Sequence, residues 1–207
     1  MQSHQDIWNQ RYAQASYAYG ELPNVFFENA LKDLHPGKLL LPAEGEGRNA
    51  VYAAKMGWQV DAFDLSESGK NKALALADKN QVSIIYQVAD VANIQFPFES
   101  FDAIALIYAH FLAEDKSAYH KQLSNYLKIG GMLIFEAFGK SHVNYQAENP
   151  AVGGPKSLEM LFSIEELEND FTGFEFHYLK EEIVDLNEGL YHKGKGAVVR
   201  MIGKKCQ

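Results

Sequence analysis

Residues 39–50 read LLLPAEGEGRNA, and this stretch decides the fold. Its leucines predict a short buried strand, and the residues from Arg48 onward predict the start of a helix. Between them, Gly45 and Gly47 leave out side chains where a ligand must come close to the backbone, and the helix start offers unpaired N–H groups. The stretch therefore indicates a cofactor-binding loop that joins a parallel strand to a helix.

The alternation of strand and helix continues outward from this loop. Short apolar runs rich in β-branched and aromatic residues recur along the chain, and most are bounded by Gly, Pro or Asp. Because helical stretches separate them, we predict an α/β fold, a Rossmann-like doubly wound sheet with helices on both faces. The expected strands are 39–41, 60–63, 84–88, 104–108 and 132–137, and the expected helices are 25–34, 48–56, 66–79 and 114–128.

The last third of the chain changes character. Ser163 and Glu166 have the spacing of a capping box, which predicts a short helix beginning at this point. Two longer strand-like runs follow, at 174–185 and 197–202, with a turn expected at 187–189. Together they predict an antiparallel hairpin at the edge of the sheet.

Composition narrows the class of protein. The 207 residues carry 19 Lys and Arg against 27 Asp and Glu, a formal charge of −8, and no basic run long enough to follow a nucleic acid backbone. No stretch has the pattern of a membrane span or an export signal, and the single cysteine, Cys206, excludes an intrachain disulfide. We expect one domain over 1–207 in the cytoplasm, without nucleic acid or membrane partners. The oligomeric state cannot be deduced from the sequence.

On spacing alone, the glycine loop fits two cofactors. Residues 45–50 satisfy the Gly-x-Gly-x-x-Ala fingerprint of NAD(P)-binding folds, and Asp64 follows at the distance of a ribose partner. However, a pyrophosphate on this loop would lie beside Glu44 and Glu46, whose charges repel it. S-adenosylmethionine (SAM) has no phosphate, and its ammonium and sulfonium charges are attracted by an acid just before the first glycine. The charges therefore favour SAM over NAD(P).

Two further acids follow the next strands of the predicted sheet. Asp64 ends the second strand, where a carboxylate can accept both ribose hydroxyls, and Asp90 ends the third, where it can accept the adenine amino group. Each acid alone is equally well explained as a turn or cap residue, but with the glycine loop they predict one cofactor site. Its other candidate members at these strand ends are Leu65, Ser66, which also fits as a helix N-cap, Ala89 and Val91.

These motifs resemble the class I SAM-dependent methyltransferases, and within them the group that includes the tellurite-resistance and thiopurine methyltransferases. The resemblance implies a sheet of order 3-2-1-4-5-7-6 with strand 7 antiparallel, SAM as cofactor and S-adenosylhomocysteine (SAH) as its product. Asn49 departs from the glycine that many members carry, although the pair Arg48-Asn49 is similar to the tellurite-resistance group. The resemblance is carried by residues 41–49 (LPAEGEGRN), 60–66 (VDAFDLS), 89–91 (ADV), 101–104 (FDAI) and 127–133 (LKIGGML) and covers most of the chain.

The resemblance extends to the N-terminal segment. Residues 8–12, WNQRY, are similar to that group's arm, which folds over the cofactor. This implies that Trp8, Arg11 and Tyr12 approach the methionine end of SAM, with an arm and helix over 1–35 covering the cofactor. From the residues alone, Trp8 and Tyr12 serve equally well to pin an N-terminal helix onto the domain.

The methyl acceptor is expected between this arm and an insert at 138–160, which contains several Gly and Pro residues; the alternative is that the insert is only a mobile surface loop. His110, just beyond the fourth strand, is the candidate catalytic base for an oxygen or nitrogen acceptor, whereas a thiolate needs no base. The alternatives are a histidine that only hydrogen-bonds the backbone or packs on adenine, and Tyr108 as either pocket wall or core. Arg48 either faces solvent or pairs with Glu44 or with the ligand carboxylate.

We therefore predict a SAM-dependent methyltransferase that acts by direct in-line displacement on a small-molecule acceptor, such as a thiol, a chalcogen oxyanion or a similar soft nucleophile. The alternatives are an NAD(P)-type oxidoreductase and a non-catalytic protein that binds SAM or SAH. The histidines are scattered, so no metal site is predicted. Besides His110 and the strand-end residues 64–66 and 89–91, the candidate site comprises Trp8, Arg11, Tyr12, Glu44, Gly45, Gly47, Arg48, Asn49 and Tyr108.

Overall fold

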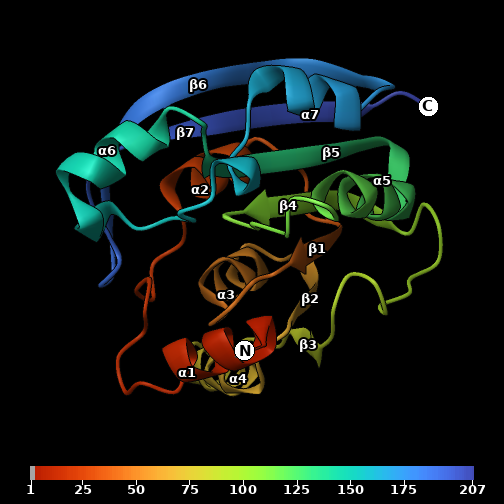
Figure 1. Cartoon of the computed structure of the whole chain (residues 1–207). Coiled ribbons are helices and arrows are strands. Elements are labelled where there is room, and N and C mark those ends of the chain that lie inside the picture. The colour runs from red at the N-terminus through yellow and green to blue at the C-terminus, as the bar shows by residue number, and fades with distance from the viewer. Residues whose placement is uncertain (1–2) are drawn as a thin grey trace.

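A computed structural model describes residues 3–207, so that residues 1 and 2 of the predicted arm 1–35 lie outside the described residues. Seven strands form one sheet of order β3-β2-β1-β4-β5-β7-β6 (Figure 1), in which β7 is antiparallel to both of its neighbours. This is the strand order that the resemblance implied. The strands are β1 (Lys38–Pro42), β2 (Gln59–Asp64), β3 (Ile85–Val88), β4 (Phe101–Ile107), β5 (Leu127–Phe138), β6 (Phe174–Glu188) and β7 (His192–Lys205).

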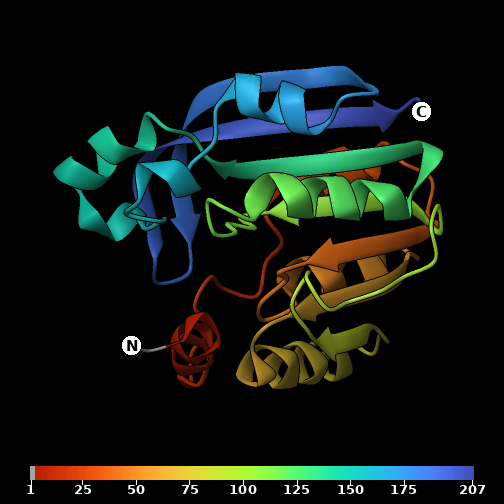
Figure 2. The same ribbon diagram turned by 45° about the vertical axis from the view of Figure 1, so that its right-hand side comes forward.

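Helices cover both faces of the sheet because successive residues of each buried strand point to opposite sides. Leu39 and Leu41 of β1 pack with α2 (Val25–Lys32), α3 (Arg48–Lys55) and α4 (Glu67–Lys79). Leu40 between them packs on the other side, in the core shared with α5 (Lys116–Tyr126) and α7 (Ile164–Asp170), and Figure 2 shows α5 in front of the strands. The continuous apolar run of β1 is thus explained by burial on both faces.

Two predicted element boundaries are corrected by the structure. The helix expected over 114–128 ends at Tyr126, because Leu127 is buried and already pairs with Phe101 of β4. Gly130, just beyond the predicted end of that helix, lies within β5 with a φ of +81°. The predicted capping box of α7 is present, with the Ser163 hydroxyl accepting a bond from the Glu166 N–H.

The C-terminal hairpin is longer than predicted. Its second strand begins at His192 rather than at residue 197, so the turn lies at 189–191 instead of 187–189. The turn packs on the N-terminal arm: the Leu190 N–H donates to the Ala18 carbonyl at 2.8 Å, and a side chain at Gly189 would clash with that same carbonyl. The arm therefore fixes the end of the hairpin.

Three segments meet at the carboxyl ends of the parallel strands. Figure 2 shows α1 (His4–Tyr12), the insert and the turn of the hairpin on the side to which the β1 and β5 arrows point. The insert is an ordered part of the fold, since Val152 and Leu161 are fully buried against Phe138. It contains α6 (His142–Glu148) and two 3₁₀ turns, Pro150–Val152 and Leu158–Met160. Within residues 3–207, no helix is long and apolar enough to cross a membrane.

Candidate functional site

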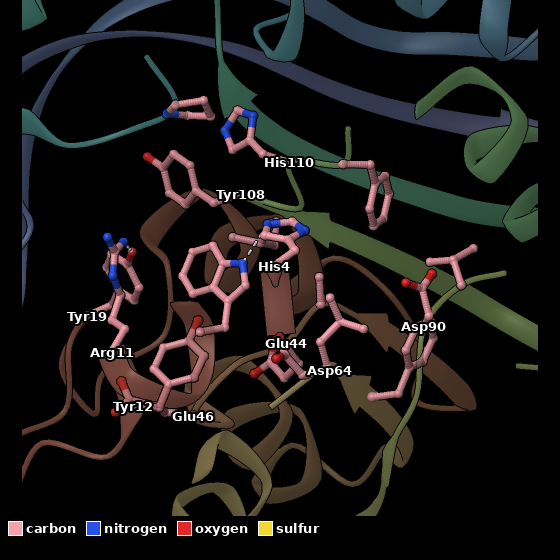
Figure 3. A pocket seen from close by; sticks show the side chains of 18 of the residues that line it. His4, Arg11, Tyr12, Tyr19, Glu44, Glu46, Asp64, Asp90, Tyr108 and His110 are labelled. Carbon is pink, nitrogen blue, oxygen red and sulfur yellow. Dashed lines mark hydrogen bonds between the residues drawn. The ribbon is translucent and has the colours of Figure 1, made fainter. Parts of the chain in front are cut away.

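A cavity of about 290 Å³ opens at the carboxyl ends of the parallel strands, where ligands bind in open α/β sheets (Figure 3). One part of it, the acidic end, is lined by Glu44, Asp64 and Asp90, which follow β1, β2 and β3. Its opposite part, the aromatic end, is lined by Tyr19, Tyr108, His110, Pro155, Met160 and His192. In Figure 3, Tyr108 and His110 lie across the cavity from Asp64 and Asp90.

Glu44 begins the glycine loop and holds the start of α3. One of its carboxylate oxygens accepts the N–H groups of Asn49 and Ala50, each at 2.8 Å, and the other accepts the Asn49 side-chain amide at 3.2 Å. Burial raises the pKa of Glu44 to about 7, although these hydrogen bonds favour its charged form. The carboxyl lines the cavity, so a nearby cation would stabilise the charged form further.

The two glycines of the loop do not line the cavity. A side chain at Gly47, whose φ is +84°, would come within 2.5 Å of Ala73 on α4, so this glycine allows two helices to pack closely. A side chain at Gly45 would come within 2.7 Å of the Tyr12 hydroxyl. The structure therefore explains both glycines by contacts within the chain, whereas the sequence suggested the approach of a ligand.

Asp64 ties the end of β2 to the glycine loop. Its two carboxylate oxygens accept the N–H groups of Gly45 at 3.0 Å and of Ser66 at 2.9 Å. Burial raises the pKa of Asp64 to about 6. Leu65 lines the cavity beside it, whereas Ser66 is fully buried and its hydroxyl accepts the Gly69 N–H as the N-cap of α4.

The residues that follow β3 form the far wall of the acidic end. Ala89, Asp90 and Val91 all line the cavity, and the Asp90 carboxylate accepts the Ala92 N–H at 3.0 Å. Burial and the neighbouring Asp90 raise the pKa of Tyr119 to about 12, so the hydroxyl of Tyr119 stays protonated at this wall. This part of the cavity offers both a hydrogen-bond acceptor and a donor.

The N-terminal helix brings three predicted residues to the cavity. Trp8 stacks on Tyr12 with ring centroids 5.4 Å apart, and Tyr12 is buried. The Arg11 guanidinium lies over the Trp8 ring at 5.0 Å and donates to the Tyr19 hydroxyl at 2.8 Å. Within residues 3–207 Arg11 forms no ion pair, so its positive charge is available at the cavity.

Arg48 and Asn49 belong to a buried polar network behind the cavity wall. The Arg48 guanidinium pairs with Glu188 at 3.1 Å and donates to the Tyr19 carbonyl at 3.2 Å, so of its interpretations neither exposure to solvent nor a direct pair with Glu44 holds. The Asn49 side chain accepts the Asn24 N–H at 2.9 Å. Both residues also line the cavity.

Tyr108 and His110 follow β4 at the aromatic end. The Tyr108 hydroxyl is buried without a hydrogen-bond partner within residues 3–207, and this residue adopts a φ of +52°. Both ring nitrogens of His110 are engaged: Nδ1 lies 3.0 Å from the Met160 carbonyl, and Nε2 accepts the Phe138 N–H at 3.4 Å. Burial lowers the pKa of His110 to about 3. These contacts favour the structural alternative over a catalytic base.

Several lining residues were missed by the sequence analysis. Tyr19 comes from the arm, Met160 from the insert and His192 from the start of β7. His192 lies 2.9 Å from the carboxylate of Glu188 across the hairpin. No local motif marks these positions, because only the packing of the hairpin turn against the arm brings them to the cavity.

The fold and this site define a Rossmann-like methyltransferase architecture, and comparison with known families agrees. Residues 40–135 match a methyltransferase domain, Methyltransf_11. This match indicates a methyltransferase with SAM as cofactor and does not support the NAD(P) alternative. No curated protein matches the sequence.

Many solved structures share the fold. A structure from work on the conversion of a disulfide bond into a thioacetal group during echinomycin biosynthesis has a TM-score of 0.80 and 18% identity, covering 98% of this chain and 92% of that one. TehB from Haemophilus influenzae has a TM-score of 0.71 and 21% identity, covering 97% and 66%. A SAM-dependent methyltransferase from Methanosarcina mazei has a TM-score of 0.67 and 17% identity, covering 86% and 96%.

Proposed function

We propose that this protein transfers the methyl group of SAM to a small-molecule acceptor with a soft nucleophilic atom. The observation that carries the proposal is the two-ended cavity, in which three strand-end acids face a compartment lined by aromatic side chains. The acidic end suits a cation-bearing cofactor, and the aromatic end suits an apolar acceptor. A volume of about 290 Å³ favours a small molecule over a macromolecular substrate.

The residues at the acidic end fit SAM. Each carboxylate offers about four acceptor positions, so Asp64 can still accept ribose hydroxyls while holding two backbone amides. Glu44 would face the ammonium group, Asp90 the adenine amino group and the unpaired Arg11 the cofactor's carboxylate. The remaining candidates, Trp8 and Tyr12, would cover the methionine end as a stacked pair.

SAM supplies an electrophilic methyl group that is attacked directly by the acceptor. The protein's contribution is to align the two reactants and to exclude water. Here α1 lines the cavity through Trp8 and Tyr12, the hairpin lines it through His192, and the insert covers the aromatic end through Met160 and Pro155. These covering segments lie outside the matched residues 40–135.

A sulfur acceptor is favoured among the soft nucleophiles. The aromatic end has apolar walls, and its Arg48 is already paired with Glu188, which disfavours a bare oxyanion. The structural neighbour studied for disulfide-to-thioacetal conversion is named for sulfur chemistry, whereas the relation to TehB links this chain to the tellurite-resistance group. We further propose a reducing cytoplasm as location, since Cys206 is an exposed thiol.

Isothermal titration with SAH, with NAD as control, tests the cofactor assignment. We expect micromolar binding of SAH and none of NAD. Asp64→Ala should weaken SAH binding at least tenfold, about 1.4 kcal/mol, because the ribose loses its acceptor. The matched control is Asp61→Asn on the same strand, which lies outside the cavity and should leave the affinity unchanged. Equal affinities of the Asp64 variant and the wild type would refute the ribose assignment.

Turnover is tested separately, with labelled SAM and a panel of small thiols, phenols and oxyanions. Methyl transfer to a member of the panel supports the proposed function. SAH binding without transfer to any member would favour the non-catalytic alternative, and binding of NAD alone would overturn the charge argument at Glu44.

A further inference from the structure

The hairpin turn carries a buried carboxylate–histidine pair that the proposed function has not yet used. Glu188 is the last residue of β6 and His192 the first of β7, and the two are paired across the strands. His192 Nδ1 lies 2.9 Å from the Glu188 carboxylate, and His192 is only 4% exposed. Since Glu188 is also paired with Arg48, it is held as a carboxylate. The Nδ1 atom of His192 therefore carries a hydrogen that it donates to Glu188.

This tautomer leaves the lone pair of His192 Nε2 free at the cavity. His192 lines the cavity, and its Nε2 has no hydrogen-bond partner within residues 3–207. The fully buried side-chain atoms without partners in this range are those of Ser100, Tyr108 and His120, so the Nε2 of His192 is not sealed off. A nitrogen with a free lone pair, oriented by a carboxylate through the other side of its ring, is the arrangement of a general base.

The electrostatics of the pair keep Glu188 ionised and His192 neutral. Although burial alone would raise it, the pKa of Glu188 is lowered to about 2 by the hydrogen bond from His192 and the charge of Arg48, so Glu188 itself stays ionised. Burial lowers the pKa of His192, and Glu188 opposes this. Other charged or titratable groups near His192 are Tyr19, Tyr108, His110, His142 and Arg11. Burial lowers the pKa of His110 and His142, so of these groups Arg11 is the one that adds a cationic charge. His192 is thus neutral and able to accept a proton.

The surroundings of His192 indicate the shape of the acceptor. The rings of Tyr19 and Tyr108 each lie with their centroids 4.6 Å from that of His192, and the buried hydroxyl of Tyr108 has no partner within residues 3–207. Flat aromatic walls favour a flat apolar ligand through stacking and edge-to-face contacts. The nearest full charges, Arg48 and Glu188, neutralise each other, and the proposed function assigns the unpaired Arg11 to the cofactor's carboxylate, so an inorganic oxyanion would meet the Glu188 carboxylate without a cation of its own.

We propose that His192, oriented by Glu188, is the base for an acceptor consisting of an aromatic or heteroaromatic ring that bears a thiol or hydroxyl group. This rests on the proposed methyltransferase function. The acceptor's sulfur or oxygen forms a bond to the methyl carbon as the bond from that carbon to the sulfonium sulfur breaks, and the electron pair of the broken bond stays on the sulfur of SAH. The acceptor's proton passes to His192 Nε2 and from there to solvent.

A series of substituted thiophenols and phenols of increasing pKa tests the base. His192→Gln should slow methyl transfer by 10²- to 10⁴-fold for acceptors that are protonated at the assay pH, and hardly at all for thiophenols that are already ionised. The variant's affinity for SAH should stay within about twofold of the wild type, which also shows that it is folded. The matched control, His177→Gln, changes an exposed histidine of β6 outside the cavity and should behave as the wild type.

A binding measurement gives an independent readout. para-Nitrophenol absorbs differently as phenol and as phenolate, so its ionisation can be followed when it binds to the enzyme saturated with SAH. We expect the wild type to bind the phenolate, with the proton on His192, and His192→Gln to bind the neutral phenol. The same spectrum for both proteins, or a loss of rate that is equal across the series, would overturn the base.

The two proposals fail in distinguishable ways. If the wild type does not bind SAH, the methyltransferase proposal itself fails. If it binds SAH and methylates selenite or tellurite but no aromatic acceptor, the acceptor class inferred here is wrong while the proposed function stands. If aromatic acceptors are methylated and His192→Gln is as fast as the wild type for all of them, the acceptor class stands and the base is wrong.

Discussion

Glu44 is the residue that the proposed function places beside the ammonium group of the cofactor. Its carboxylate holds the N–H groups of Asn49 and Ala50 while lining the cavity, and burial raises its pKa to about 7. At pH 7 the ligand-free carboxyl is therefore about half protonated. A bound ammonium group favours the charged form and so lowers the pKa of Glu44.

We predict from this that SAH binding at pH 7 releases on the order of half a proton from Glu44. Titration calorimetry in buffers of different ionisation enthalpy measures that number directly, because each released proton adds the buffer's heat. Glu44→Gln should bind SAH more weakly and release no proton. If this variant releases as many protons as the wild type, the titrating group is another one, and Asp64, with a pKa of about 6, is the first to examine.

The sequence identified the residues of the acidic end because each follows a recognisable strand. The sequence did not explain why residues 45 and 47 are glycines. A side chain at Gly45 would clash with Tyr12 and one at Gly47 with Ala73, and these close approaches exist only in the folded chain. The histidines show the same limit. His110 follows β4 and was a natural candidate for a base, whereas the accessible nitrogen belongs to His192, which reaches the cavity through a turn placed by the arm.

At the level of elements, the alternation of apolar strands and amphipathic helices predicted the α/β class, whereas the strand order was implied by the resemblance to the class I methyltransferases. The boundaries of the elements were less predictable. The helix α5 joins the strand β5 directly at Leu127, because Leu127 is buried and pairs with Phe101 of β4. The defined conformation of the insert was also not predictable, because it depends on a lysine that is distant in the sequence. Lys116 of α5 donates to the carbonyls of Glu159 and Leu161 at 2.8 and 3.1 Å and pairs with Glu166 of α7.

The bonds of Lys116 to the carbonyls of Glu159 and Leu161 form a clamp on the insert. We predict that this clamp affects the binding of the acceptor and not that of the cofactor. Met160, between the two carbonyls that Lys116 holds, lines the aromatic end and contacts His110. Lys116→Met removes bonds from a charged donor, each worth about 1.5–3 kcal/mol. We expect the KM for the acceptor to rise about tenfold or more while the affinity for SAH changes less than twofold. Limited proteolysis should cleave the variant faster within residues 138–160.

Lys140→Met is the matched control for the clamp. Lys140 pairs with the same Glu166 carboxylate at 3.1 Å, but it is half-exposed and holds no carbonyl of the insert. Its loss should leave both the KM and the cleavage pattern close to those of the wild type. Similar effects of the two substitutions would place the cause in Glu166 rather than in the insert.

Across the whole molecule, the two ends of the cavity have different origins. The acidic end lies entirely within residues 40–135, the part that matches the methyltransferase domain. Apart from Tyr108 and His110, the aromatic end is built by the arm, the insert and the hairpin. A buried network connects the two, since Asn24 bonds to Asn49 of the loop and to both Glu136 of β5 and Glu188 of the hairpin. The proposed function thus places the choice of acceptor in segments outside residues 40–135.

The buried carboxyls and the buried histidines have opposite effects on how the free energy of unfolding changes with pH. Glu44 and Asp64 have folded-state pKa values of about 7 and 6, above their ordinary 4.5 and 3.8, so between pH 5 and 6 the folded state binds more protons at these groups and stability falls as pH rises. His110 has a folded-state pKa of about 3, below its ordinary 6.5, so the unfolded state binds the extra proton and stability rises with pH. Burial lowers the pKa of His142 and His192 in the same sense as that of His110.

We therefore predict that the free energy of unfolding of the ligand-free protein changes little between pH 5 and 6. Single substitutions of a buried carboxyl or a buried histidine should change the slope of this free energy against pH in opposite directions. Urea unfolding at several pH values within this window measures the slope. Removing one fully titrating difference changes the slope by about 1.4 kcal/mol per pH unit. His110→Asn should make stability fall with rising pH, and Glu44→Gln should make it rise. Because slopes are compared, a general loss of stability in either variant does not affect the test, and tilts of the same sign in both would contradict the assignment of the buried protons.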